Sequence, residues 1–218
     1  ELEQVTDKER EVDLTITKKD LSNVWSEINP LNSRGFIVEG NQVMFEVPGL
    51  AVFSIEGGKT ITFSTYGNDN DDKIRLYILG SCLGILLMQK RVLPLHGSAI
   101  AIEGKAYAFI GESGAGKSTL ASSFVNKGYK LLSDDVVAIS LMEENQPWVN
   151  PSYPQQKLWQ ESLNAFGLDS TDYQPLFDRT TKFSIPVQAD FYNKPLPLGG
   201  IFELVGADIE SIELQTIE

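Results

Sequence analysis

Nine consecutive residues near the middle of the chain have the spacing of a phosphate-binding loop. They match the pattern G-x-x-x-x-G-K-[ST] and are Gly111, Glu112, Ser113, Gly114, Ala115, Gly116, Lys117, Ser118 and Thr119. Glycines let backbone N–H groups surround an anion, and the N-terminus of a following helix adds its positive dipole. In such a loop Lys117 contacts the outer phosphates and the Ser118 hydroxyl binds Mg²⁺. We therefore expect a nucleoside triphosphate site; the alternative is a glycine-rich turn without a ligand.

Two adjacent carboxylates, Asp134 and Asp135, follow the next predicted helix and short strand. In a P-loop fold this position lies beside the phosphates, where a carboxylate can hold Mg²⁺ directly or through water. One of two neighbouring carboxylates can serve the metal while the other acts as general base for an attacking hydroxyl. The residues alone do not assign the two roles, and a solvated acidic turn is the alternative.

Three basic or titratable residues outside the loop are further candidates. His96 is the only histidine and begins a predicted hairpin that leads into the loop, so it is either a packed strand residue or a functional one. Arg179 and Lys182 lie in a polar stretch before a predicted strand. Either can form a second cationic contact to phosphoryl oxygens, the alternative being a solvated loop charge. We retain Lys182 as a candidate catalytic residue.

The elements that must position these residues are predicted to form two regions. In residues 1–92, alternating apolar residues from Gln42 to Ser64 predict a small antiparallel β-meander. A long helix from Asp72 to Arg91 follows, with acidic residues at its start and basic residues at its end. We expect this region to pack on a P-loop core formed by residues 93–218. We also expect that core to continue in further chain after Glu218.

Within residues 93–218 the sequence predicts strands and helices that alternate around the loop. The predicted strands are 95–102, 106–110, 129–132, 136–141, 198–205 and 209–214, and the predicted helices are 118–127 and 156–166. Trp159 and Phe166, seven residues apart, are expected to be the buried stripe of the second helix, the alternative being a groove for a peptide. The polar region from Glu143 to Asn193 is the expected location of substrate loops.

Composition excludes several classes of function. The 218 residues carry 18 Lys+Arg against 30 Asp+Glu, a net charge of −12, which disfavours binding to nucleic acid. One cysteine and one histidine cannot form an internal disulfide, a zinc finger or a Cys–His–Asn triad. The longest apolar run, Leu76 to Met88, is too short to span a membrane, and residues 1–19 contain no signal-peptide core. We expect a cytoplasmic protein that acts away from membranes.

The segment from Leu95 to Val137 resembles the C-terminal catalytic domain of HPr kinase/phosphorylase and its shorter relatives. The shared features are the His96-Gly97 pair, the hairpin, the P-loop and the Asp134-Asp135 pair. The resemblance implies an α/β P-loop kinase fold of the phosphoenolpyruvate-carboxykinase type, with ATP and Mg²⁺ as cofactors and a serine hydroxyl as acceptor. It also implies that Asp134 is the general base, that Asp135 is a metal-site acid and that His96 lies near the γ-phosphate.

The chain departs from the bifunctional enzymes downstream of the acidic pair. Where they carry Leu-Glu-Ile-Arg-Gly, residues 150–159 read Asn-Pro-Ser-Tyr-Pro-Gln-Gln-Lys-Leu-Trp, which argues against reverse phosphorylase activity. This text and the N-terminal meander resemble short HPr-kinase-like proteins such as lasso-peptide kinases. We therefore expect a serine kinase for a precursor peptide; an HPr-type kinase/phosphorylase, a small-metabolite kinase and a non-catalytic nucleotide sensor are the alternatives. The resemblance leaves a homo-oligomer open.

Overall fold

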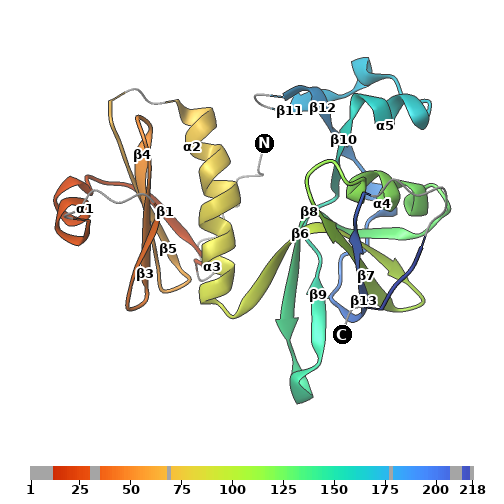
Figure 1. The fold of residues 1–218 in the computed structure, drawn as a ribbon, viewed down its shortest axis with the longest axis horizontal. Helices are drawn as coiled ribbons and strands as arrows, with labels where there is room; N and C mark the ends of the chain where they lie inside the picture. The colour runs from red at the N-terminus through yellow and green to blue at the C-terminus, as the bar shows by residue number, and fades with distance from the viewer. Residues whose placement is uncertain (1–11, 30–34, 68–69, 177–178, 207–212, 217–218) are drawn as a thin grey trace. The chain divides into compact units, whose positions relative to one another are not determined.

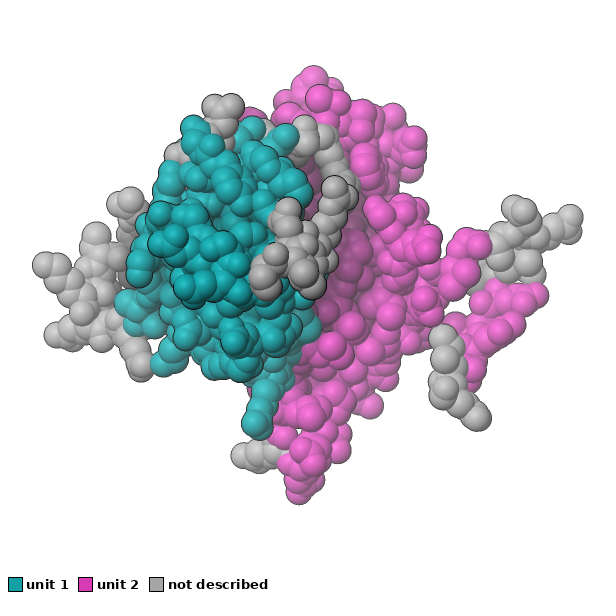
Figure 2. Space-filling view, turned by 60° about the vertical axis from the view of Figure 1, so that its left-hand side comes forward, with its two compact units in different colours: residues 1–92 teal, residues 93–218 magenta. Residues whose placement is uncertain are grey.

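A computed structural model describes residues 12–29, 35–67, 70–176, 179–206 and 213–216. They divide into two compact units, Glu1–Val92 (unit 1) and Leu93–Glu218 (unit 2), which Figure 2 colours separately. Each unit buries hydrophobic clusters of its own. No helix in the described ranges has the length and apolar content needed to cross a bilayer.

Unit 1 contains a five-stranded sheet in the order β1-β5-β4-β3-β2. Its strands are β1 (Thr15–Lys18), β2 (Phe36–Glu39), β3 (Gln42–Val47), β4 (Ala51–Glu56) and β5 (Thr60–Thr65). The meander predicted between Gln42 and Ser64 is confirmed as β3, β4 and β5, which pair antiparallel. The flanking strands complete the sheet, because β2 pairs antiparallel with β3 and β1 pairs parallel with β5.

Both faces of this sheet are covered by helices (Figure 1). One face packs against α1 (Ser22–Ile28), and the other against α2 (Asp71–Tyr77), a π-helical turn η1 (Ile78–Cys82) and α3 (Leu83–Gln89). The long helix predicted from Asp72 to Arg91 is thus confirmed, with a π turn around Gly80-Ser81 that the pattern did not indicate.

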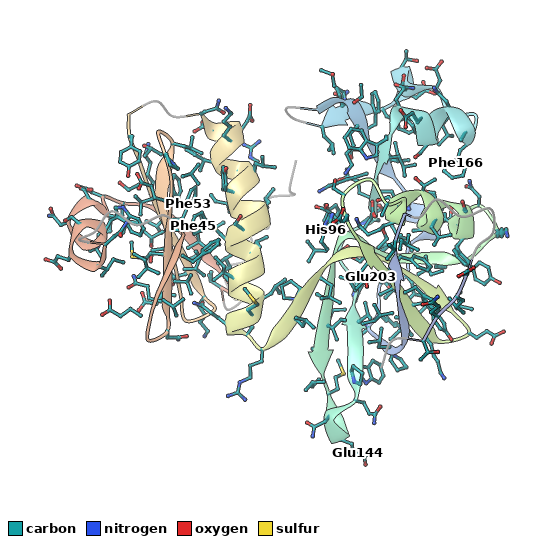
Figure 3. All side chains as sticks on the ribbon, in the orientation of Figure 1. Phe45, Phe53, His96, Glu144, Phe166 and Glu203 are labelled. Atoms are coloured by element: carbon teal, nitrogen blue, oxygen red, sulfur yellow. The ribbon has the colours of Figure 1, made fainter. Side chains whose placement is uncertain are left out.

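Side chains alternate between the two faces as the pleat of a strand requires. On β3 and β4, Phe45 and Phe53 face α2 and α3, whereas their neighbours Met44 and Val52 face α1. The Phe45 and Phe53 rings stack with centroids 5.1 Å apart, and Figure 3 labels both on the sheet. Because both faces are covered, β4 is buried at five consecutive residues and shows no period of two, so the meander was visible from the alternation in β3 and from the turn residues between the strands.

Unit 2 is built on a closed barrel in the strand order β13-β7-β6-β8-β9. The strands are β6 (Val92–Ile102), β7 (Lys105–Gly111), β8 (Lys130–Leu141), β9 (Pro147–Asn150) and β13 (Leu196–Leu204). The predicted hairpin is confirmed as β6 and β7, and β13 pairs parallel with β7. The helix predicted at 118–127 is confirmed as α4 (Lys117–Val125). The two strands predicted at 129–132 and 136–141 are one continuous strand, β8.

A three-stranded sheet in the order β10-β12-β11 lies beside the barrel in the chain's second half (Figure 1). Its strands are β10 (Gln155–Trp159), β11 (Gln174–Leu176) and β12 (Arg179–Pro186). The helix α5 (Gln160–Ala165) and the short turn η3 (Ser170–Asp172) lie between β10 and β11 in the chain, the turn η4 (Gln188–Asp190) follows β12, and the turn η2 (Glu143–Asn145) joins β8 to β9. Figure 3 labels Glu144 at the tip of the turn between β8 and β9.

The helix predicted at 156–166 is wrong in its first part. Gln156 and Leu158 are buried in β10 with period two, and this strand pairs antiparallel with β12. Trp159 therefore ends a strand, while Phe166 packs on the cluster around Leu163, so the two do not form one helical stripe. The strand predicted at 198–205 is confirmed as β13. Most of the strand predicted at 209–214 lies outside the described residues.

Candidate active site

The predicted phosphate-binding loop joins the end of β7 to the start of α4. Gly111, Gly114 and Gly116 have φ angles of 138°, 91° and 93°, in the region that L side chains rarely adopt. A Cβ on Gly111 would also lie 2.5 Å from the carbonyl oxygen of Leu204, because β13 runs beside β7 at this point. The first glycine thus permits both the turn and the close approach of a neighbouring strand.

Lys117 is buried at the first position of α4. Its Nζ donates hydrogen bonds to the carbonyl oxygens of Gly111 (2.9 Å) and Glu112 (2.7 Å). Two carbonyl dipoles therefore compensate a cation that is largely out of contact with bulk water. The ammonium lies at the loop itself, where it can contact phosphate oxygens held by the loop.

Asp134 is buried in β8, with only 2% of its surface exposed. Its Oδ1 accepts hydrogen bonds from the hydroxyls of Ser98 and Ser118 (2.9 Å for Ser118), and its Oδ2 accepts one from the backbone N–H of Lys157 (2.7 Å). The donors come from β6, α4 and β10, so three elements converge on one carboxylate. Asp134 is held in place and leaves little room for an acceptor hydroxyl.

Asp135 differs from Asp134 in conformation and exposure. Its φ of 83° lies in the left-handed region, which is uncommon for a residue other than glycine and interrupts the strand geometry of β8. Its side chain is 33% exposed, and its Oδ2 accepts a hydrogen bond from Lys157 Nζ at 2.6 Å. The Nδ1 of His96 donates to the carbonyl oxygen of Asp135 at 3.0 Å and lies 3.8 Å from Oδ1.

An open pocket brings most of the predicted site residues together. Those that line it are His96, Ser113, Gly114, Gly116, Lys117, Ser118, Thr119, Asp135 and Lys182. Asp134 does not line the pocket, although it holds the hydroxyl of Ser118, which does. Figure 3 labels His96 on β6 in this part of unit 2.

Lys182 reaches the pocket from β12. Its strand partner across the sheet is Trp159, and its Nζ lies 5.3 Å from the centroid of the indole ring, within the range of a cation–π contact. The side chain of Arg179 lies outside the described residues. Trp159 also lines the pocket, although it was expected in the core of a helix, and so do Glu161 and Ser162, which the sequence did not suggest.

Lys157, which the sequence did not suggest as a site residue, contacts both aspartates of the acidic pair. Burial by itself lowers the pKa of its ammonium, but the hydrogen bond and charge of Asp135, with a contribution from Tyr153, outweigh burial and raise that pKa. Lys157 is therefore a cation at neutral pH. The sequence carried no period-two signal here, because Gln156 is polar although it is buried with Leu158 on the face of β10 opposite to residue 157.

Comparison with known proteins gives partial matches. No family model matches this chain. The HPr kinase/phosphorylase of Streptococcus salivarius is 28% identical over 125 residues, 57% of this chain and 39% of that protein. The enzyme of the same name from Mycoplasmopsis pulmonis is 37% identical over 70 residues, 31% of this chain and 23% of that protein. A solved structure of the Hpr(Ser) kinase/phosphatase from Coxiella burnetii aligns with a TM-score of 0.35 and 18% identity, over 56% of this chain and 65% of that one.

These matches show distant homology to HPr kinase/phosphorylase. The chain spans about two-fifths of the length of the streptococcal relative, since the aligned part is 39% of that protein. The structure itself shows a mixed α/β chain, in which the glycine-rich loop joins strand β7 to helix α4.

Proposed function

We propose that unit 2 binds Mg²⁺–ATP and transfers the γ-phosphoryl group to a serine hydroxyl of a protein or peptide. The observation that carries this proposal is that Lys117, Ser118 and Asp135 line one pocket, with Asp134 buried directly behind Ser118. Distant homology to enzymes named HPr kinase/phosphorylase supports the same chemistry. A pure nucleotide sensor would not require a carboxylate exposed beside the phosphate-binding loop.

The residues present fit a magnesium ion. Ser118 Oγ and Asp134 Oδ1 lie 2.9 Å apart at the start of α4 and are the hard oxygen donors that Mg²⁺ prefers. Mg²⁺ usually keeps several waters and shares phosphate oxygens rather than occupying an all-protein cage. Consistent with that, the described ranges contain no group of three or more His, Cys, Asp or Glu that would hold a metal. When bound, the ion neutralises charge on the phosphates; Ser118 and Asp134 would hold it, Asp134 directly or through water.

We assign the role of general base for the acceptor hydroxyl to Asp135 and the role of metal-site acid to Asp134. This is the reverse of the roles expected from the resemblance. A general base must reach the proton that it abstracts, and Asp135 lines the pocket whereas Asp134 is buried under three hydrogen bonds. In this assignment the serine proton moves to Asp135 as the serine oxygen bonds to the γ-phosphorus and the bond to the bridging oxygen breaks. Lys117 from α4 and Lys182 from β12 both line the pocket and contribute positive charge to it.

Two acceptors are candidates. The relatives reported above are named for the protein HPr, which favours an HPr-type serine as acceptor. The departure of residues 150–159 from the Leu-Glu-Ile-Arg-Gly segment favours a different acceptor, such as the serine of a natural-product precursor peptide. Within residues 150–159, Gln155–Trp159 form β10, and Trp159 lines the pocket. An acceptor bound in the pocket would therefore be within reach of this differing segment.

The test is transfer of label from γ-labelled ATP and Mg²⁺ to HPr and to a panel of serine-containing peptides, with the labelled residue located by mass spectrometry. We expect phosphoserine on one of the two acceptor classes. Lys117→Ala should bind ATP more weakly and transfer about 10²–10³-fold more slowly, because it removes charge from the phosphates. Binding of Mg²⁺–ATP without label on HPr, peptide or water would instead favour a nucleotide sensor.

A further inference from the structure

Lys157 contacts both aspartates through different atoms. Its backbone N–H donates to Asp134 Oδ2 at 2.7 Å, and its side-chain Nζ donates to Asp135 Oδ2 at 2.6 Å. One residue of β10 thereby connects the carboxylate behind Ser118 with the carboxylate that faces the pocket.

The sheet that contains β10 holds residue 157 in this position. Lys157 stands opposite Ser184 of β12, and the residues on either side of it, Gln156 and Leu158, are buried. The paired strand and its two buried side chains keep the backbone N–H at Asp134 and direct the side chain to the opposite face. Only the side-chain contact depends on residue type, because every residue except proline supplies the N–H.

The ammonium of Lys157 is well placed to orient Asp135. The two side chains are 23% and 33% exposed, so the pair is less screened by water than an ion pair on the surface. His96 is the other group close to this carboxylate, at 3.8 Å from Oδ1. Lys117, Glu161 and Lys182 line the same pocket from α4, α5 and β12. A short charge-assisted hydrogen bond to one carboxylate oxygen leaves the other, Oδ1, available to the pocket.

We propose that Lys157 is a positioning residue for phosphoryl transfer, whose ammonium holds Asp135 in the orientation from which it takes the proton of the acceptor hydroxyl. The inference rests on the proposed function and adds a residue to it. Lys157 acts through Asp135 and makes no bond to the transferred group. Its loss should therefore slow the chemical step without weakening the binding of Mg²⁺–ATP.

The first experiment compares Lys157→Met and Lys157→Arg with wild type. Methionine keeps the backbone N–H to Asp134 and removes the ammonium, so we expect kcat to fall about 10²-fold while the affinity for Mg²⁺–ATP, measured by calorimetry, stays within about twofold. Arginine, which can still pair with a carboxylate, should restore most of the lost rate. Lys130→Met is the matched control, because it removes the ion pair with Asp190 at 2.8 Å, also in unit 2 and away from the pocket. That control should keep its rate.

The second experiment is a double-mutant cycle of Lys157→Met with Asp135→Asn. If Lys157 acts through Asp135, the double variant should lose no more rate than Asp135→Asn alone. Losses that multiply, a kcat of Lys157→Met within threefold of wild type, or an equal loss of rate in Lys130→Met would each overturn the proposal. Wild-type protein that binds Mg²⁺–ATP but transfers nothing would instead contradict the proposed function, so the two failures are distinguishable.

Discussion

The two units place different kinds of side chain in their interiors. Among the described residues of unit 1, the buried polar side chains are those of Asn29 and Ser54, and the rest of its core is apolar. In unit 2 the buried residues include two ionisable ones, Lys117 and Asp134. The buried polar or charged residues described in this unit are Ser98, Lys117, Ser122, Ser133, Asp134, Gln156 and Ser162. Unit 1 is therefore held mainly by packing, whereas unit 2 also uses hydrogen bonds to keep charged groups in place.

This difference has a physical cost in unit 2. A buried polar group is stable only when it has hydrogen-bond partners, and a buried charge requires more of them. Asp134 has three donors and Lys117 has two carbonyl acceptors, whereas the buried Nε2 of Gln156 has no partner among the described atoms. The comparison shows that packing alone accounts for unit 1, while the interior of unit 2 is arranged around a site that must hold charge.

The largest expected effect concerns the two aspartates within unit 2. Asp135→Asn should lower the transfer rate about 10²–10⁴-fold, the usual contribution of a positioned base, with Mg²⁺–ATP affinity within about twofold of wild type. Asp134→Asn should lower the rate and raise the Mg²⁺ concentration needed for half-maximal transfer, because it alters the carboxylate that accepts a hydrogen bond from Ser118. Steady-state kinetics and calorimetry check both variants. Transfer by Asp135→Asn within tenfold of wild type would remove it as the base.

The next effect tests the packing of unit 1. Phe53 is fully buried and stacks on Phe45, so Phe53→Ala should lower the free energy of unfolding by about 3–5 kcal/mol. Val38, which is 68% exposed on β2, is the control, and Val38→Ala should change stability by less than about 0.5 kcal/mol. Urea denaturation followed by circular dichroism measures both. If both variants lowered the free energy of unfolding equally, the buried aromatic layer would not be the main source of the stability of unit 1.

The smallest expected effect is a pH dependence of unit 1. Burial raises the pKa of the Cys82 thiol to about 12, compared with 9.0 for an unperturbed thiol. Between these values the unfolded chain loses the thiol proton and the folded chain keeps it, so this group makes the folded state less stable as pH rises above 9. Cys82→Ala should flatten that part of the stability curve.

Alkylation provides an independent measure of the same thiol. At pH 8 iodoacetamide should label Cys82 in the folded protein at least about 100-fold more slowly than in urea, because the side chain is buried and protonated. Equal labelling rates in folded and unfolded protein would show that this part of unit 1 is open in solution. Mass spectrometry of the intact chain follows the reaction.

Elements with a strong period or a recognisable spacing were predictable from sequence. The meander of unit 1, the hairpin of β6 and β7, and the helix after the loop were all found near their predicted bounds. Each has local causes, namely alternation in strands, turn residues between them, and glycines before a helix. The first part of the helix predicted at 156–166 was wrong because the pairing of β10 with β12 overrode a short and ambiguous apolar pattern, whereas its second part is confirmed as α5.

Conformation at Asp135 was not predictable in the same way. A break between two strands was expected at residues 133–135, but β8 is continuous and takes up the irregularity in one left-handed residue. Local propensity disfavours that conformation, so it persists only where surrounding contacts impose it. Here those contacts come from His96 and Lys157, which are 39 and 22 residues away along the chain.

The sequence by itself determined the phosphate-binding loop, because the spacing of glycines, lysine and serine is a local property of the backbone that binds phosphate. It also placed two adjacent aspartates after the helix that follows the loop, in what the structure shows to be the middle of β8. Only the tertiary structure decided which carboxylate is buried against Ser118 and which faces the pocket. Only it placed Lys157 against both aspartates and Lys182 in the pocket. The reason is that burial and hydrogen-bond partners come from elements distant in the sequence, so identical residue types at adjacent positions acquire different environments.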